Sequence, residues 1–452
     1  MTTVTLMYPY FHRSNDNSIF RFPPLGLGYV AACLKKAGIT VELVDCTFLR
    51  QDEALEKVRR SQPRIIGMQV MFSMKEKALE LARLLKKDCE LLVAGGPLPT
   101  SDPEEFLRSF DVVVVGEGEQ TMLELVRAVQ NVTSLMNVKG IAFREKDKVK
   151  VTPPRDFIKD LDSIAFPSRE FFNHRAYMRY FKEKFGYTET SVITSRGCPF
   201  NCDFCSRPVF GNSFRSRTAA NIVDEVEAVH KLGYERVWFA DDCFTLDRKR
   251  LLNICDELVR RRANVSWECL SRVDTVDGQI AQKMKQAGCV RVFFGIESGN
   301  DLILRIMKKQ VTTKQAERAV HVFKKAGIQV GAFFILGYPG ESSETVLDTV
   351  RFASSLPLDY LSFTFPYPIP GTPLFDRVKC SMISQEWKEP QNIHLIEHKL
   401  LFCSSFSEAK LKFAIFKGMT QFYLRKYMGN RLYGLIGRPY EIVTDAAYKA
   451  LD

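Results

Sequence analysis

Short apolar runs alternate with amphipathic stretches along the first third of the chain. Five runs have the length and the β-branched composition of strands, at residues 4–8, 41–44, 65–70, 91–94 and 112–115. After the first run, apolar residues recur at helical spacing at Leu27, Val30, Ala31 and Leu34, and Gly38 follows where such a helix would end. This pattern predicts an α/β domain over residues 1–150, with a doubly wound, parallel, Rossmann-like sheet.

The same alternation restarts at Ser191. Six further apolar runs lie near Val192, Val237, Val265, Val292, Val330 and Leu361, and helical stretches such as 219–232 and 346–355 separate them. Six strand–helix units predict a partial (β/α)6 barrel over residues 191–375, with functional loops at the carboxyl ends of the strands. Residues 151–190 have weak periodicity and indicate a linker with one short helix. Residues 376–452 are predicted to be mostly helical.

Three cysteines, Cys198, Cys202 and Cys205, lie within eight residues after the first of these six runs. A cluster of four irons normally takes four cysteines, so this loop leaves one iron free for a ligand that is not protein. A structural zinc site normally needs two CxxC-like pairs, and the pair Cys202 and Cys205 is the only CxxC in the chain. The spacing therefore predicts an iron–sulfur cluster rather than a zinc site.

Composition indicates the compartment and the kinds of partner to expect for this protein. The 12 cysteines are spread over 452 residues and no signal peptide precedes the first strand, which argues against a disulfide framework. No apolar run reaches the ~20 residues of a membrane helix. The surplus of 64 Lys and Arg over 53 Asp and Glu is spread along the chain, without an RNA-recognition motif, so nucleic acid is not expected as a partner. We expect a soluble, cytoplasmic protein.

The cysteine spacing, with its adjoining glycine and proline, resembles the signature of the radical S-adenosylmethionine (SAM) superfamily. The resemblance implies a [4Fe–4S] cluster on the three cysteines, SAM chelated to the free iron, and reductive cleavage of SAM to a 5'-deoxyadenosyl radical. Phe204 is expected beside the adenine. Segments on the barrel rim match the GIES and GxPGE segments of the superfamily, and the implied SAM contacts are Asp242, Arg272, Glu297, Ser298 and Gly337.

Glycine-rich loops in the first 150 residues carry a second resemblance. Each loop alone is compatible with ordinary turns, but FPPLGLG (22–28), GGP (95–97) and GEGE (116–119), in this order before the cysteine loop, resemble the cobalamin-binding domain of one large radical SAM class. This resemblance covers about the first 375 residues. The implied cobalamin contacts are Pro9, Gln69, Ser73, Gly95, Gly96, Pro97, Thr100, Gly116, Glu117 and Gly118.

The chain departs from one cobalamin pattern. Proteins that ligate cobalt through histidine carry D-x-H-x-x-G after the first strand, and residues 8–14 read YPYFHRS instead. We expect His12 to be an ordinary loop residue, as in the many members of the radical SAM class that lack this frame. Cobalt would then have no histidine below it.

Together the two resemblances imply a cobalamin-dependent radical SAM methyltransferase acting on an unactivated carbon. One SAM would methylate cobalamin, with methylcobalamin as the intermediate, and a second would supply the radical. The favoured substrate is a peptide or protein side chain, such as the glutamine modified by protein C-methyltransferases that act on methyl-coenzyme M reductase in methanogens. A small molecule is the next alternative. Ferredoxin or flavodoxin is the expected electron donor.

Other functions stay open from the sequence. A cobalamin-dependent cyclase or rearrangement enzyme would share this architecture, as the oxygen-independent porphyrin cyclase does. A methylthiotransferase usually needs a second cysteine set, and a cobalamin carrier or sensor would leave the cysteine loop idle. His394 and His398 have the i, i+4 spacing of a metal site on a helix but no third ligand, so a solvated helical face is expected. The basic, aromatic segment 407–452 either packs on the barrel or contributes to substrate binding.

Overall fold

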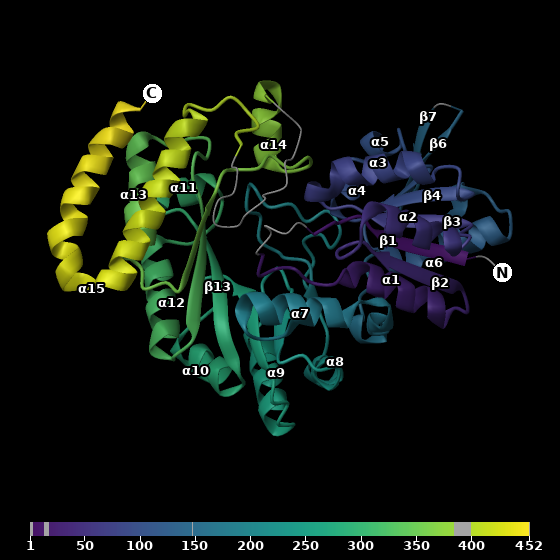
Figure 1. Ribbon diagram of the computed structural model, residues 1–452, viewed down its shortest axis with the longest axis horizontal. Helices are drawn as coiled ribbons and strands as arrows, with labels where there is room; N and C mark the ends of the chain where they lie inside the picture. Colours follow the sequence, from purple (N-terminus) through teal and green to yellow (C-terminus); the bar gives the residue numbers. More distant parts are fainter. Residues whose placement is uncertain (1–2, 13–17, 147, 384–398, 452) are drawn as a thin grey trace.

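Two parallel sheets, each with its own hydrophobic core, form the body of the molecule. The computed structural model describes residues 3–12, 18–146, 148–383 and 399–451. Figure 1 places the first sheet, in purple and blue, beside the second, in teal and green, and the C-terminal helix at the far end of the second. The predicted order of a Rossmann-like domain, a partial barrel and a helical C-terminal region is confirmed.

The first sheet has seven strands in the order β2-β1-β3-β4-β5-β6-β7. Its elements are β1 (Thr3–Tyr8), α1 (Leu25–Lys36), β2 (Thr40–Asp45), α2 (Gln51–Arg60), β3 (Ile65–Gln69), α3 (Lys75–Leu85), β4 (Leu91–Gly95), α4 (Pro97–Ser101), α5 (Pro103–Phe106), β5 (Val112–Val114), α6 (Gly118–Gln130), β6 (Ile141–Glu145) and β7 (Lys148–Val151). β1 to β5 are the five predicted strands and pair in parallel. β2 lies on one side of β1 and β3 on the other, so the order of the strands reverses at β1, and a crevice for a ligand is expected at the carboxyl ends of β1 and β3.

β6 and β7 extend the first sheet in antiparallel fashion, which the sequence analysis did not predict. Lys148 to Val151 reads KVKV, the alternation typical of a strand with one solvated face. The sheet therefore ends on a polar hairpin rather than on a buried parallel strand.

The second sheet has six parallel strands in sequence order along one open sheet, as the partial (β/α)6 barrel predicts. Its elements are β8 (Glu189–Val192), α8 (Ala219–Lys231), β11 (Arg236–Phe239), α9 (Arg248–Arg260), β12 (Ser266–Ser271), α10 (Gly278–Gln286), β13 (Cys289–Glu297), α11 (Asp301–Ile306), α12 (Thr313–Lys325), β14 (Gln329–Ile335), α13 (Ser343–Ser355) and β15 (Tyr360–Thr364). The linker contains α7 (His174–Phe185).

A segment of the first domain fills the open bore of this barrel. The ring of Phe20 lies 5.1 Å from that of Trp238, 5.7 Å from that of Phe293 and 6.4 Å from that of Phe333, measured between centroids. Phe22 stacks between Phe181 of α7 and Trp238. Because apolar contacts of this kind are favourable wherever water is excluded, the chain that leaves β1 fastens the first domain to the second.

The C-terminal region consists of α14 (Pro373–Val378) and the long α15 (Glu408–Ala450). α15 folds back on itself: Lys417 Nζ lies 2.7 Å from Asp445 Oδ1, whereas in a straight helix residues so separated would be about 42 Å apart. The two arms are visible in yellow in Figure 1, and α15 packs on α13. His394 and His398 lie outside the described residues.

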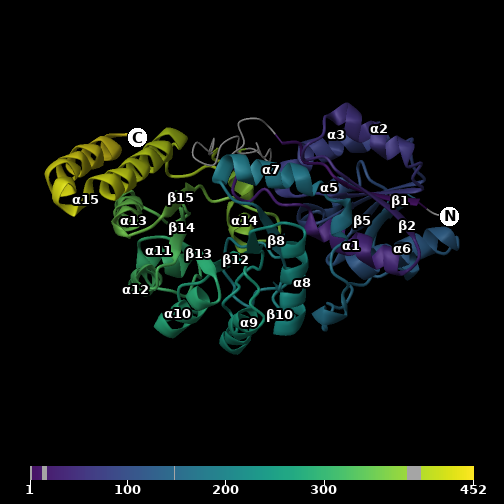
Figure 2. The same ribbon diagram turned by 60° about the horizontal axis from the view of Figure 1, so that its bottom comes forward.

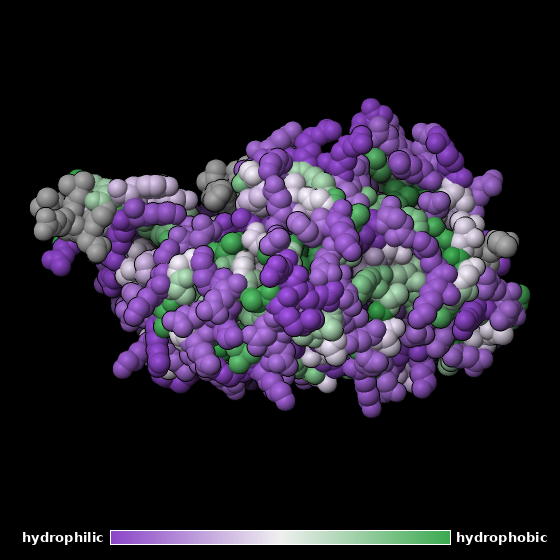
Figure 3. All heavy atoms as spheres, turned by 90° about the horizontal axis from the view of Figure 1, so that it is seen from below, coloured by the Kyte–Doolittle hydropathy of each residue, from purple (hydrophilic) through white to green (hydrophobic). Residues whose placement is uncertain are grey.

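The surface is dominated by polar side chains. Figure 3 shows hydrophilic residues over most of the face seen from below, with hydrophobic residues mainly in the hollows between them. None of the helices in the described part of the chain is long and apolar enough to span a membrane.

The ion pair that closes α15 gives a first prediction. Lys417 is fully buried, so Asp445→Ala leaves a buried ammonium without its carboxylate and is expected to lower the free energy of unfolding by about 3 kcal/mol. Amide hydrogen exchange in the second arm should accelerate. Asp52→Ala, which removes an exposed partner of Arg50, is the control and should change neither quantity. Equal stability of the two variants would contradict the fold-back role of this pair.

Candidate functional site

The cysteine loop begins where β8 ends, and Asp241 holds that point in place. Asp241 Oδ1 accepts hydrogen bonds from the amides of Thr194, at 2.6 Å, and Ser195, at 3.1 Å. Its Oδ2 accepts from the two hydroxyls. Asp241 is 1% exposed and follows β11, the neighbouring strand, so two strand ends of the barrel jointly fix the start of the loop.

The loop is then closed by its own backbone. β9 (Ser195–Arg196) pairs with β10 (Arg215–Ser216), and the residues between them contain the three cysteines. Gly197 has φ of 81°, and a Cβ there would lie 2.4 Å from the carbonyl oxygen of Ser213, so glycine is required. The Arg207 guanidinium donates to the carbonyls of Cys198 and Phe200, which draws the first half of the loop inward.

The three thiols are presented by this one loop. Burial raises the pKa of Cys198, and it raises the pKa of Cys205 to about 12, with the neighbouring Cys202 adding to the effect. Both thiols are therefore protonated at neutral pH until a metal replaces the proton. No three His, Cys, Asp or Glu side chains of the described residues already stand together as a metal site. The donor set, three thiols and no fourth residue, fits an iron–sulfur cluster with one iron open to another ligand.

Asp203, between the second and third cysteines, ties the loop to the C-terminal side of the barrel. Its Oδ2 accepts a hydrogen bond from the Tyr338 hydroxyl at 2.8 Å and pairs with Arg377 of α14. Its amide donates to the carbonyl of Met307 at 2.9 Å, and its carbonyl accepts from the amide of Leu374. The position of the loop therefore depends on segments more than 100 residues further along the chain.

Two cations and two carboxylates lie beside the loop on the barrel rim, with Arg272 paired to Asp274 at 2.9 Å. The Arg272 guanidinium lies 3.5 Å from the centroid of the Phe200 ring, and its Nη1 lies 3.7 Å from Cys202 Sγ. Its Nη2 donates to the carbonyl of Lys309 at 2.8 Å. Lys309 Nζ is 2.9 Å from Glu297 Oε1. This group supplies the charges that the carboxylate and the ammonium of an amino-acid moiety require.

Lys309 was missed by the sequence analysis. Burial acts to lower its pKa, but the carboxylate of Glu297 and the nearby Cys202 outweigh burial, so the pKa of Lys309 is raised and the side chain stays charged. Gly295 leaves room for this pair, because a Cβ there would lie 2.4 Å from Glu297 Oε1. The signal in the sequence was weak, since Lys309 stands in a run of charged residues typical of a helix end.

Three of the predicted SAM contacts pack against other parts of the fold. Phe204 lies in the loop, with its ring 6.4 Å from that of Tyr338. The Ser298 hydroxyl is fully buried and bonded to Thr349 Oγ1 at 3.0 Å, and a Cβ on Gly337 would lie 2.4 Å from Leu411 of α15. Ser298 and Gly337 therefore help to pack the rim, and their contact with SAM stays a prediction.

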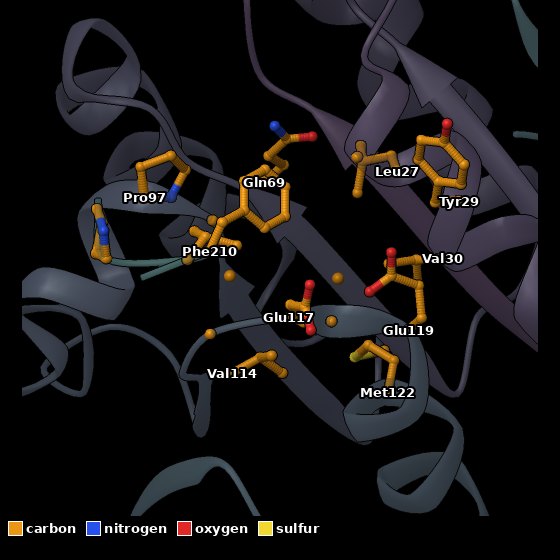
Figure 4. A pocket seen from close by; sticks show the side chains of 18 of the residues that line it. Leu27, Tyr29, Val30, Gln69, Pro97, Val114, Glu117, Glu119, Met122 and Phe210 are labelled. Carbon is orange, nitrogen blue, oxygen red and sulfur yellow. The ribbon is translucent and has the colours of Figure 1, made fainter. Parts of the chain in front are cut away.

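A cavity of about 330 Å³ lies between the carboxyl ends of the first sheet and the cysteine loop (Figure 4). Seven of the ten predicted cobalamin contacts line it: Gln69, Gly95, Gly96, Pro97, Gly116, Glu117 and Gly118. Across from them stand Asp242, Arg207 and Phe210. The cavity therefore has walls from both domains, and Asp242 reaches it although its neighbour Asp241 does not. Burial, reinforced by the charge of Asp241, raises the pKa of Asp242.

The lining suits a large flat ligand that carries amide groups. Gly96 has φ of 99°, and a Cβ there would come within 3.1 Å of the Val70 carbonyl oxygen. Gln69 Oε1 is buried and has no hydrogen-bond partner among the residues that the structure describes. An unsatisfied buried acceptor is costly, and an amide donor of a ligand would satisfy it. On both counts the residues fit cobalamin, whose corrin ring carries amide side chains.

Three of the predicted cobalamin contacts, Pro9, Ser73 and Thr100, do not line the cavity. Thr100 Oγ1 instead accepts a hydrogen bond from the amide of Gly116 at 3.2 Å and so supports one lining loop. His12 packs its ring against those of Tyr180, at 5.2 Å, and Phe48, at 5.7 Å, away from the cavity lining.

Glu117 lines the cavity as predicted for a cobalamin contact, and its carboxylate is held by two arginines of the second domain. Its Oε1 lies 2.9 Å from Arg196 Nη1 and 2.9 Å from Arg215 Nη1, and its Oε2 accepts from the amide of Ile158. Glu119 Oε1 lies 2.5 Å from Arg196 Nη2. We call Glu117, Glu119, Arg196 and Arg215 the interdomain ion cluster. Both arginines and the amide of Ile158 bind the carboxylate of Glu117, although the residue itself borders the cavity.

Two protein-family models match this chain, one over the barrel with its cysteine loop and one over the first domain. The model of the radical SAM superfamily matches residues 192–353, and the model of the B12 binding domain matches residues 16–126. Together with a relative that is 33% identical over most of both chains, these matches define the class. The chain belongs to the cobalamin-dependent radical SAM enzymes.

Particular relatives extend this assignment. An uncharacterized methyltransferase of Pyrococcus horikoshii is 33% identical, covering 89% of this chain and 88% of its own. The anaerobic magnesium-protoporphyrin IX monomethyl ester cyclase of Rubrivivax gelatinosus is 31% identical, covering 83% of this chain and 70% of its own. The radical SAM methyltransferase TsrM of Kitasatospora setae, solved with cobalamin and a [4Fe–4S] cluster, shares the fold with a TM-score of 0.71 at 20% identity, covering 85% of this chain and 76% of that one.

The closure of the cysteine loop is tested by Gly197→Ala. Strain at positive φ costs about 1–2 kcal/mol, and the added clash with Ser213 should open the loop, so most of the iron taken up in anaerobic reconstitution is expected to be lost. Gly186→Ala is the matched control, because Gly186 has φ of 82° and nothing within 4 Å of its Cβ position. It should lose a similar amount of stability from strain and keep its iron. Iron analysis and thermal unfolding measure the two effects.

Proposed function

We propose that this protein transfers a methyl group to an unactivated carbon of its substrate, using a [4Fe–4S] cluster, SAM and cobalamin. The observation that carries the proposal is the shared cavity: glycine loops that fit cobalamin form one wall, and residues 206–210, which directly follow the three cysteines in their loop, form the other. A radical formed at the cluster must meet the methyl donor before it meets water, so both sites have to open into one enclosed space.

The residues have separate tasks in this proposal. When bound, the cluster with SAM supplies a carbon radical and cobalamin supplies the methyl group. Cys198, Cys202 and Cys205 hold the cluster. Arg272 and Lys309 are placed to bind the carboxylate of SAM and Glu297 its ammonium, while Asp242 faces the cavity from the rim. A low-potential protein such as ferredoxin or flavodoxin is the proposed electron donor.

We propose a small molecule as the substrate in preference to a peptide side chain. The peptide prediction depended on the basic, aromatic C-terminal segment, and α15 packs on α13 at the end of the barrel remote from the first domain (Figures 1 and 2). None of the described residues of that segment lines the cavity. The name of the cyclase relative specifies a porphyrin ester, which is a small molecule.

Ring formation without methyl transfer is the second candidate, because the cyclase relative is nearly as similar as the methyltransferase relative. The two reactions leave different products. Methyl transfer yields S-adenosylhomocysteine together with 5'-deoxyadenosine and adds one methyl to the product. Cyclisation yields 5'-deoxyadenosine with no gain of a methyl.

The proposed chemistry is tested with Cys202→Ala in the reconstituted full chain. Formation of 5'-deoxyadenosine from SAM and a strong reductant is expected to fall to background, because the cluster loses a ligand, while hydroxocobalamin still binds. Cys403→Ala replaces an exposed cysteine outside the loop and should leave both measurements unchanged. Turnover retained by Cys202→Ala would rule out the cluster as the source of the radical.

The lower face of cobalt gives a separate test. Since His12 packs against Tyr180 and Phe48 and does not line the cavity, the electron paramagnetic resonance spectrum of bound cob(II)alamin is expected to show no coupling to a protein nitrogen. His12→Ala should give the same spectrum as the natural chain. A nitrogen coupling that disappears in His12→Ala would reverse this assignment.

A further inference from the structure

The loop of residues 116–119 has two roles at once. Gly116 and Gly118 line the cavity, and the carboxylates of Glu117 and Glu119 hold Arg196. Arg196 directly precedes Gly197 and Cys198, the first cluster ligand. A continuous series of contacts therefore runs from the cavity wall, through the ion cluster, to the cysteine loop.

The ion cluster can transmit a constraint because it is buried and balanced. None of its four side chains is more than 7% exposed. The pairs run in series from Glu119 through Arg196 and Glu117 to Arg215, and releasing Arg196 would leave the buried carboxylate of Glu119 without its cation. The four groups are therefore expected to move together or not at all.

Arg196 also borders the cavity itself. Its guanidinium carbon lies 5.0 Å from the centroid of Phe210 and 5.4 Å from that of Tyr29, and all three residues are part of the lining. A ligand in the cavity would displace water from the surroundings of the ion cluster. Lower local polarity strengthens the attraction between the paired charges, and contact with Gly116 and Gly118 restrains the loop that carries the carboxylates. Both effects favour the arrangement in which Arg196 holds the cysteine loop closed.

We propose that Glu117 and Glu119 are positioning residues that couple the two cofactor sites, so that cobalamin in the cavity tightens cluster binding and the cluster tightens cobalamin binding. This inference rests on the proposed function, since it requires both cofactors to bind. The coupling must be equal in both directions, because the free energy of loading both sites does not depend on the order of loading.

The coupling is measured as a ratio of cobalamin affinities. Hydroxocobalamin is titrated by equilibrium dialysis into the full chain with a reconstituted cluster and into the same chain without iron. We expect the cluster-loaded form to bind at least about 5-fold more tightly, the lower end of typical coupling between sites. Glu119→Gln should bring the ratio close to one, because it removes one of the two carboxylates that hold Arg196.

A matched control is present elsewhere in the chain. Glu225 is 1% exposed and pairs with Arg169 and Arg217, so it is also a buried carboxylate between two arginines, but it is absent from the cavity lining. Glu225→Gln should lower the free energy of unfolding as Glu119→Gln does. Its ratio of cobalamin affinities, with and without the cluster, should equal that of the natural chain. If Glu119→Gln takes up no cluster, the ratio of cobalamin affinities is measured in Arg196→Lys instead. Lysine keeps the positive charge but cannot pair with Glu117 and Glu119 through two separate nitrogens.

The outcomes separate the two proposals. A ratio near one in the natural chain, or a ratio that survives Glu119→Gln, overturns the coupling while the two-cofactor function stands. A ratio that falls equally in Glu225→Gln also overturns it, because general loss of stability would then be the cause. If neither form of the natural chain binds hydroxocobalamin, the proposed function fails and the coupling fails with it.

Discussion

The arrangement of the two domains depends on the interdomain ion cluster. Placing four charges out of water is unfavourable unless every one is paired, so such a cluster adds less to stability than to specificity. Apolar contacts between the domains, such as Phe20 and Phe22 against the barrel, are favourable in many relative orientations. The ion cluster restricts the orientation more strongly, because its buried charges must meet at ion-pair distances. That orientation sets the glycine loops opposite the cysteine loop and so defines the shape of the cavity.

Elements with a strong local period were predictable from the sequence. Most of the parallel strands in the two sheets contain a short apolar run, because both faces of a parallel sheet are covered. The hairpin of β6 and β7 was missed, since its short polar alternation resembles an exposed loop. The three cluster cysteines lie in one loop and needed no tertiary information, which is why their spacing alone identified the chemistry.

Roles that depend on distant contacts were not predictable. Motif matching identifies the loops on the rim but not the packing of a side chain, so the contacts of Ser298 with Thr349 and of Gly337 with Leu411 were not predicted. Glu117 was expected at the cofactor because its neighbours are glycines, whereas its carboxylate pairs with an arginine 79 positions away. The two carboxylates of GEGE and the arginines on both sides of the cysteine loop were the signal available for that pairing.

The loops that border the cavity share one structural feature. Each loop that faces the cavity is held by a residue that leaves the cavity free: Asp241 beneath the start of the cysteine loop, Asp203 within it, and Thr100 beneath the glycine turn. Such residues act on backbone amides or on other side chains, so they constrain where a cofactor sits without specifying what it reacts with. Choice of substrate is then left to the side chains on the cavity wall. This division is consistent with a single architecture supporting both methyl transfer and ring closure among relatives of this chain.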